Sequence, residues 1–130
     1  MMELLKYVLL VDDDEAYNLF NKAILKLHNP QIKIETLTDG QELINHVTNT
    51  NEDKWPSIVF LDLNMDLVDG LEFLEWYHNN RHTGKMKIII FSSSTVPETI
   101  EKCLAYKDVL GYFEKPLNKS KINDILKLTD

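Results

Sequence analysis

Short apolar runs alternate with amphipathic segments along the chain. Five runs rich in aliphatic and β-branched residues predict strands, at residues 7–11, 32–37, 58–63, 87–91 and 109–113. Between and after these runs, apolar residues recur at spacings of three and four, which is typical of helices with one buried face. The pattern therefore predicts five successive strand–helix units.

Local signals predict where several of these helices begin. Asp39 followed by Glu42 resembles a capping box, in which side-chain acceptors satisfy free N–H groups of the first turn. Pro97 suits a first helical turn, and Asn118 can cap the last helix. These residues predict that the second, fourth and fifth helices begin close to positions 40, 97 and 119.

The first helical segment carries a separate apolar stripe. Phe20, Ile24 and Leu27 recur at helical spacing, and Leu19 and Ala23 widen the stripe on one side. An apolar stripe of this kind is normally the face that a helix buries against its neighbours. We therefore expect this stripe to pack on the sheet.

The strands predict the kind of sheet. The runs 58–63 and 87–91 are almost continuously apolar, as expected of parallel strands that helices cover on both faces. With right-handed crossovers, the simplest arrangement is an open α/β sheet of flavodoxin-like strand order 2-1-3-4-5, (βα)5, whose sites form beyond the carboxyl ends of the strands. We expect one domain over residues 1–130, with no output domain.

Composition narrows the class of protein. The chain has 14 basic and 21 acidic residues, a net charge of −7, which disfavours direct binding to nucleic acid. Cys103 is the only cysteine, so an internal disulfide is excluded. No apolar run approaches the roughly 20 residues that cross a bilayer, and no targeting segment is recognisable. We expect a cytoplasmic protein without a membrane span.

Carboxylates follow two of the predicted strands. The first strand runs into Asp12, Asp13 and Asp14, and the third reaches Asp62. Clustered carboxylates repel one another unless a cation joins them, and a hard divalent ion with oxygen ligands would serve. Mg²⁺ is therefore the predicted ion. The alternative, in which Asp13 and Asp14 only cap the first helix, stays open for the pair taken alone.

A hydroxyl and an ammonium group reach the same edge of the sheet. Ser92 follows the fourth strand, and Lys115 follows the fifth. During phosphoryl transfer the phosphate oxygens need hydrogen bonds and neutralising charge. A carboxylate acceptor, Mg²⁺, a hydroxyl and a lysine therefore form a chemically coherent set.

The motifs, taken in order, resemble the receiver domain of response regulators. They are Val11-Asp12-Asp13, Phe60-Leu61-Asp62-Leu63-Asn64-Met65, Asp69-Gly70, Ser92 and Lys115-Pro116. The match spans essentially the whole chain. It implies a stand-alone receiver in phosphorelay signalling, which accepts a phosphoryl group from a histidine kinase or histidine phosphotransfer protein. It also implies a signalling domain rather than an enzyme, with self-catalysed phosphoryl transfer and dephosphorylation only.

The resemblance also implies roles for the acidic residues. Asp62 would be the phosphoryl acceptor. Asp13 and Asp62 would bind Mg²⁺ directly with the Asn64 backbone carbonyl, and Asp12 would assist through water. Asp66 stands where the family commonly has proline, which leaves that turn less rigid.

The remaining implied roles concern the response to phosphorylation. Lys115 would pair with the phosphate, through a cis Lys115-Pro116 peptide bond, and Ser92 would contact a phosphate oxygen. Tyr112 stands at the switch aromatic position, although covering the sheet edge would explain it equally well. Ser94 and Asn64 lie where receivers tune phosphate lifetime.

The expected output is binding to an unidentified downstream protein through the surface of the fourth helix, fifth strand and fifth helix, about residues 97–128. The free chain should be a monomer, or a dimer promoted by phosphorylation. An interaction module that is no longer phosphorylated remains an alternative. A haloacid-dehalogenase-like phosphatase is disfavoured because Asn64 stands where its second catalytic Asp would be. An FMN-binding flavodoxin is disfavoured by the acidic loop after the first strand.

Overall fold

The computed structural model describes residues 5–65, 67–80, 86–93 and 96–128. The strands are β1 (Tyr7–Val11), β2 (Lys33–Leu37), β3 (Ile58–Asp62), β4 (Lys87–Ser92) and β5 (Val109–Glu114). The helices are α1 (Glu15–His28), α2 (Gly40–Asn49), α3 (Gly70–Asn79), α4 (Pro97–Leu104) and α5 (Lys119–Lys127), with a short 3-10 helix at Glu52–Lys54. The prediction of five strand–helix units is confirmed. The predictions for Asp66 and Ser94 fall outside the described residues.

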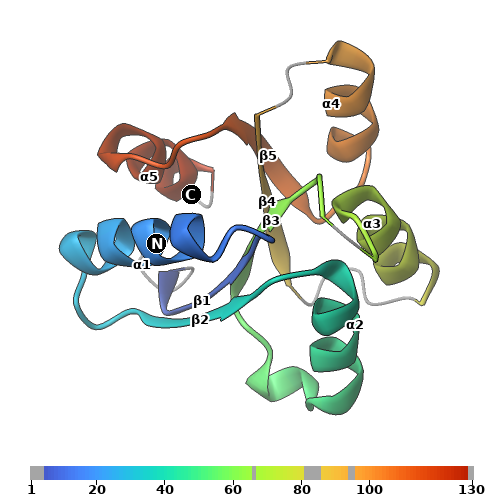
Figure 1. Ribbon diagram of the computed structural model, residues 1–130, viewed down its shortest axis with the longest axis horizontal. Coiled ribbons are helices and arrows are strands. Elements are labelled where there is room, and N and C mark those ends of the chain that lie inside the picture. The colour runs from blue at the N-terminus through green and yellow to red at the C-terminus, as the bar shows by residue number, and fades with distance from the viewer. Residues whose placement is uncertain (1–4, 66, 81–85, 94–95, 129–130) are drawn as a thin grey trace.

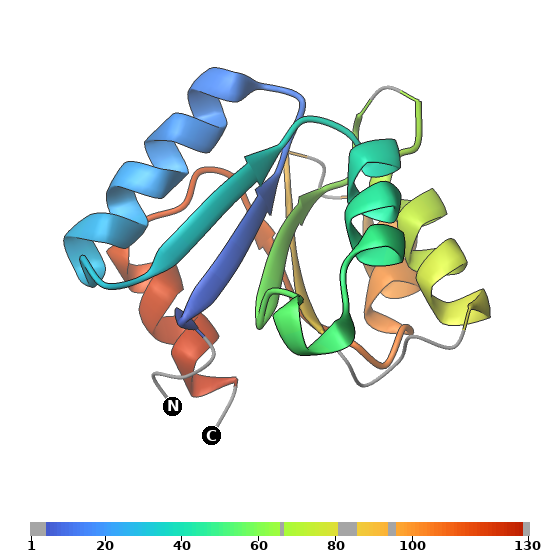
Figure 2. The same ribbon diagram turned by 90° about the horizontal axis from the view of Figure 1, so that it is seen from below.

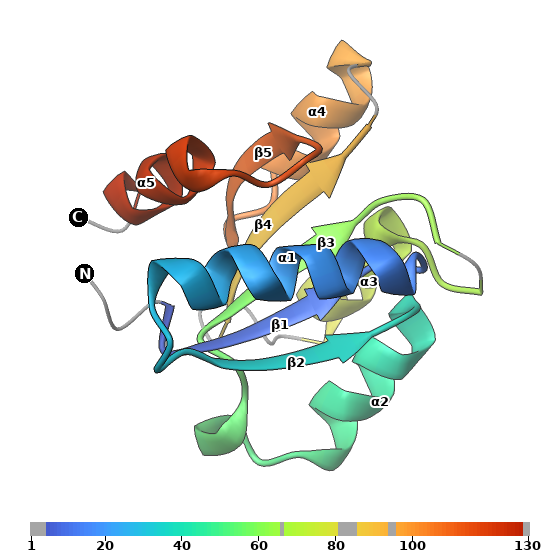
Figure 3. The same cartoon turned by 60° about the vertical axis from the view of Figure 1, so that its left-hand side comes forward.

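The five strands form one parallel sheet in the order β2-β1-β3-β4-β5, as predicted (Figure 1; Figure 3). The register brings the carboxyl ends of the strands to one edge. Val11 pairs with Leu37 and Leu61, so Asp12 and Asp62 follow paired positions. On the other side of β3, Ser92 lies in register with Glu114.

Helices cover both faces of the sheet, with α1 and α5 on one side and α2, α3 and α4 on the other (Figure 2). Alternate strand residues point to opposite faces. In β1, Leu9 and Val11 pack toward the face of α2, α3 and α4, and Val8 and Leu10 pack toward α1 and α5. The sheet therefore separates two apolar cores, one on each face.

The predicted helix starts are confirmed. Asp39 accepts a hydrogen bond from the Glu42 backbone N–H at 2.8 Å, and Pro97 occupies the first turn of α4. Asn118 accepts a hydrogen bond from the Lys121 backbone N–H at 2.8 Å. Among the described residues, every helix is too short or too polar to cross a bilayer.

The prediction for the buried face of α1 is wrong. The residues of α1 that are buried are Asn18, Asn21 and Leu25. In contrast, 66% of Leu19 and 83% of Leu27 are exposed, so most of the apolar stripe faces away from the sheet, and only Ile24 is half-buried against the core on this side. The reason is tertiary hydrogen bonding, because the Asn18 amide nitrogen donates to the Asp12 and Leu37 carbonyl oxygens at 3.0 and 3.1 Å. These bonds rotate the helix so that its polar residues face inward.

Candidate metal centre

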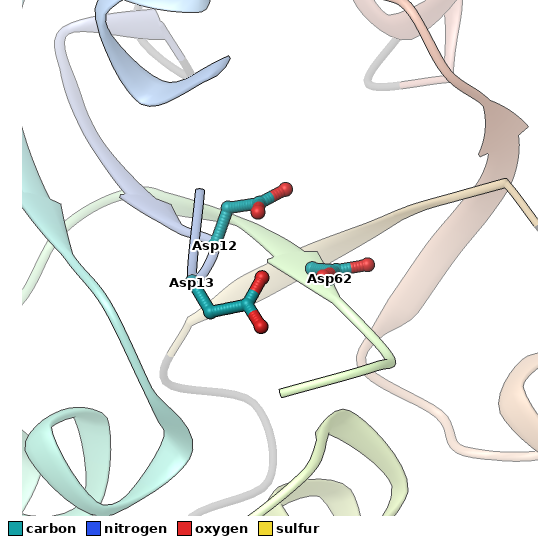
Figure 4. Close-up of side chains that lie close together, drawn as sticks. All are labelled: Asp12, Asp13 and Asp62. Carbon is teal, nitrogen blue, oxygen red and sulfur yellow. The ribbon is translucent and has the colours of Figure 1, made fainter. Parts of the chain in front are cut away.

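Three carboxylates converge at the carboxyl edge of the sheet (Figure 4). Asp12 and Asp13 directly follow β1, and Asp62 is the last residue of β3. One oxygen of each carboxylate lies within 4.8 Å of the other two. Asp12 and Asp62 are buried, whereas Asp13 is exposed. A set of three oxygen ligands that is open on one side fits a hard divalent cation that keeps part of its hydration shell.

Backbone contacts hold Asp12 in place. Its N–H donates to the Leu37 carbonyl at 3.1 Å, and its carboxylate accepts from the Asp14 N–H at 2.9 Å. The Asn18 side chain donates to the Asp12 carbonyl. Asp14 is the N-cap of α1, where it accepts from the Tyr17 N–H at 3.2 Å. The capping interpretation is therefore correct for Asp14 and leaves Asp13 in the acidic cluster.

Lys115 brings a positive charge into this cluster. Its Nζ lies 2.6 Å from Asp12 Oδ2 and 3.5 Å from Asp62 Oδ1. Its backbone N–H donates to the Ser92 carbonyl at 3.0 Å, which ties the end of β5 to the end of β4. The peptide bond to Pro116 is cis, the isomer that the resemblance implies. The Lys121 ammonium donates to the Pro116 carbonyl at 2.8 Å, and this hydrogen bond stabilises the chain just after the cis bond.

Burial and crowding shift the acid–base behaviour of the site. Burial, followed by the negative charge of Asp12, raises the pKa of Asp62 to about 6, although Lys115 and the Asn64 backbone N–H oppose the increase. Burial acts to lower the pKa of Lys115, but its hydrogen bond to Asp12 and the two carboxylate charges raise it above its ordinary value. In the absence of a metal ion, the ionised form of Asp62 therefore destabilises the folded protein.

This cost predicts a pH-dependent stability in the metal-free protein. The pKa of Asp62 rises from 3.8 to about 6 on folding, so the folded state binds more protons between these pH values and loses stability as the pH rises through them. Asp62→Asn should therefore stabilise the protein at pH 7, by on the order of 2 kcal/mol, and change little near pH 4. Urea unfolding in EDTA, followed by tryptophan fluorescence, measures both values. If Asp62→Asn changes the free energy of unfolding equally at pH 4 and pH 7, the ionisation of Asp62 is not the source of the pH dependence.

The other predicted site residues lie around this cluster. Ser92 is fully buried at the end of β4, one residue beyond the partner of Asp62 in the sheet. Asn64 is exposed on the loop after β3. Tyr112 is half-buried on β5 and packs against the core under α2, α3 and α4. The roles of Ser92 and Tyr112 in switching stay predictions.

Sequence reasoning did not identify Asn18 or Tyr17. Asn18 anchors Asp12, and the ring of Tyr17 lies under the Lys115 ammonium, with its centroid 4.5 Å from Nζ. The hydrogen bonds of Asn18 reach the carbonyl groups of Asp12 and Leu37, which periodicity within the helix does not reveal. The contact between Tyr17 and Lys115 joins distant parts of the chain and leaves no local pattern.

Solved structures share this architecture. A two-component response regulator from Cytophaga hutchinsonii superimposes with a TM-score of 0.85 and 29% identity, over 95% of this chain and 96% of that chain. A receiver domain protein from Methanospirillum hungatei gives a TM-score of 0.76 and 25% identity, over 96% and 93%. The Mn²⁺-bound form of response regulator Rcp1 gives a TM-score of 0.74 and 22% identity, over 94% and 89%.

The match to a known protein family spans both the sheet and the acidic cluster. The model of the response regulator receiver domain matches residues 8–127, which include β2 to β5, all of β1 except Tyr7, and every residue of the acidic cluster. A comparison with curated proteins finds no match. The resemblance that the motifs indicated is therefore confirmed: this chain belongs to the family of response regulator receiver domains.

Proposed function

We propose that this chain accepts a phosphoryl group on Asp62 from a histidine kinase or a histidine phosphotransfer protein, in a reaction that requires Mg²⁺. The observation that carries this proposal is the convergence of three carboxylates and one lysine at the carboxyl edge of the sheet. Membership of the receiver domain family supports a role in two-component signalling. The product would be a signalling state of the chain, because the acceptor is the protein itself.

The acidic cluster supplies the ligands that Mg²⁺ requires. Asp13 and Asp62 would bind it directly together with the Asn64 backbone carbonyl, and Asp12 would contribute through water. The bound ion would neutralise charge on the phosphate oxygens during transfer. A protein of the same fold, Rcp1, has been solved with Mn²⁺ bound. The donor set here is all oxygen, which suits either of these hard ions.

The protein residues would act on the phosphoryl group directly. An Asp62 oxygen attacks phosphorus, the bond from phosphorus to the donor nitrogen breaks, and an acyl phosphate forms on Asp62. With its pKa at about 6, Asp62 is mainly a carboxylate at neutral pH, as a nucleophile must be. Lys115 would pair with the transferred phosphate, and the Ser92 hydroxyl would donate to one of its oxygens.

The direct test uses acetyl phosphate as a small phosphoryl donor. With Mg²⁺ present, intact mass spectrometry should show one added phosphoryl group per chain, and EDTA should prevent its addition. The metal dependence follows because the carboxylates of the cluster otherwise repel an incoming phosphate. A chain that stays unmodified with acetyl phosphate and with phosphohistidine donors would instead be an interaction module that works without phosphorylation.

We infer that the output surface lies on α4, β5 and α5, between residues 97 and 128. Of the two proposed phosphate contacts, Ser92 precedes this stretch of chain and Lys115 lies within it, between β5 and α5, and a backbone hydrogen bond of 3.0 Å joins them. A movement of either residue therefore reaches the ends of α4 and β5. Lys102 and Lys119 are exposed on this surface and could select a downstream protein by charge. Self-association through the same surface would give a dimer promoted by phosphorylation.

Beryllofluoride, a mimic of the phosphoryl group, tests this inference by amide-shift mapping. With Mg²⁺, shifts should extend from Asp62 into α4 and β5, because Ser92 gains a contact that the free form lacks. In Ser92→Ala the response of α4 and β5 should be largely lost, while Ser93→Ala, an exposed neighbour, should behave as the wild type. Shifts confined to the acidic cluster in the wild type would place the output surface elsewhere.

A further inference from the structure

Tyr17 lies beside the proposed phosphoryl site but has no role in the mechanism described above. It is on the first turns of α1, where its backbone N–H is held by the capping Asp14 at 3.2 Å. Its ring stacks on Phe20, with centroids 6.4 Å apart and an interplanar angle of 23°. The helix start and this stacking together fix the ring at the rim of the acidic cluster.

The ring faces the ammonium group of Lys115. Lys115 Nζ lies 4.5 Å from the ring centroid, within the range of a cation–π contact. The same Nζ contacts Asp12 and Asp62, so two carboxylates and one aromatic face surround it. The Tyr17 hydroxyl is buried near the Asn21 side chain and the Leu117 backbone. The ring is the part of this side chain that contacts Lys115.

The three contacts of Lys115 respond differently to a bound metal ion. A divalent cation on Asp12, Asp13 and Asp62 neutralises the carboxylates and repels the nearby ammonium. The attraction between the ammonium and the ring arises from the ring quadrupole, and binding of a metal ion to the carboxylates leaves it in place. Phosphoryl acceptance needs the ammonium and the metal ion in the site together. A contact that survives metal binding would meet this need.

We propose that Tyr17 is a positioning residue, whose ring keeps the Lys115 ammonium at the site while a divalent ion occupies the carboxylates. This inference rests on the proposed function, because it concerns the lysine that would pair with the transferred phosphate. The contact is specific to the aromatic face, so phenylalanine should replace Tyr17 and leucine should not. Nothing else among the described residues offers Lys115 an aromatic face.

The first test reads the contact directly by NMR, without a phosphoryl donor. Protons on the Lys115 Cε should resonate upfield in the wild type because they lie over the Tyr17 ring, and Lys115→Arg identifies the signal. The upfield position should persist when Mg²⁺ is added, remain in Tyr17→Phe and disappear in Tyr17→Leu. Loss of the upfield position on addition of Mg²⁺ to the wild type would overturn the proposal, since the ammonium would then have left the ring.

The second test asks whether Tyr17 acts through Lys115. With saturating Mg²⁺, Tyr17→Leu should slow phosphorylation by acetyl phosphate about threefold to tenfold, and Tyr17→Phe should stay near the wild-type rate. The affinity for beryllofluoride should fall by a similar factor in Tyr17→Leu but show no further loss when Lys115→Met is already present. If Tyr17→Leu lowers the beryllofluoride affinity as much in the Lys115→Met background as in the wild type, Tyr17 has only a packing role. The same conclusion follows if Tyr17→Phe slows phosphorylation as much as Tyr17→Leu does. Failure of the proposed function would appear separately, as a wild type that takes no phosphoryl group.

Discussion

Asp62→Asn should abolish the phosphoryl group that acetyl phosphate and Mg²⁺ add to the wild type. The amide of Asn is a poor nucleophile and cannot form the acyl phosphate, while its size and shape leave β3 undisturbed. Asp62 is buried at the end of a fully buried strand, so a small change of shape is tolerated better than a change of volume. Intact mass after incubation should show the unmodified chain alone.

Asp14→Asn is the matched control for this variant. It makes the same chemical change two residues from Asp12, but on the exposed N-cap of α1, where asparagine caps as well as aspartate. The control should take up the phosphoryl group as the wild type does. Equal modification of Asp62→Asn and the wild type would move the acceptor to another residue, which peptide mapping would locate.

Gly70→Ala should both destabilise the fold and slow phosphorylation. A Cβ at this position would lie 2.7 Å from the Asp62 carbonyl oxygen and 2.9 Å from Leu63 Cα, and both are backbone atoms that cannot rotate away. The Gly70 N–H also donates to the Leu63 carbonyl at 3.0 Å, so the loop after β3 is closed at this point. The backbone shift that relieves this clash should lower the free energy of unfolding by about 1–3 kcal/mol, as overpacking does in other proteins. It should also displace the backbone next to the proposed phosphoryl acceptor.

Gly111→Ala provides the comparison for Gly70→Ala. A Cβ on Gly111 would approach only the ends of the Leu128 and Phe113 side chains, at 3.1 Å, and these side chains can shift. Its loss of stability should therefore be clearly smaller, with the phosphorylation rate unchanged. Urea unfolding and the acetyl phosphate reaction measure both quantities on the two variants. Equal loss of stability at the two positions would show that backbone contact at Gly70 is not the cause.

The sequence allowed the sheet and the acidic cluster to be predicted for a physical reason. The strands of a parallel sheet are buried on both faces, so the apolar runs 58–63 and 87–91 differ plainly from the amphipathic segments around them. Because the carboxyl ends of such strands meet at one edge, residues that follow different strands must converge there. The positions of Asp12, Asp62 and Lys115 at one edge therefore follow from topology alone.

The orientation of α1 could not be predicted in this way. Its periodic apolar residues gave a clear helix, but Phe20 and Leu27 are exposed and only Ile24 packs against the core. Periodicity measures how apolar residues cluster around a helix axis, whereas the buried face also depends on hydrogen bonds to distant carbonyl groups. Asn18 makes such bonds to the ends of β1 and β2, which no local pattern reports. The contact between Tyr17 and Lys115 was missed for the same reason.

The buried asparagines of α1 also affect how the helix responds to temperature. Exposure of apolar surface raises the heat capacity of a protein, whereas exposure of polar surface lowers it. Detaching the first half of α1 would expose Asn18 and Asn21 as well as apolar atoms of the sheet, so the two contributions partly cancel. The stability of this half of α1 should therefore vary less steeply with temperature than that of helices docked by apolar side chains alone. The free energy with which α1 packs beside the proposed phosphoryl site would then be similar at low and high temperature.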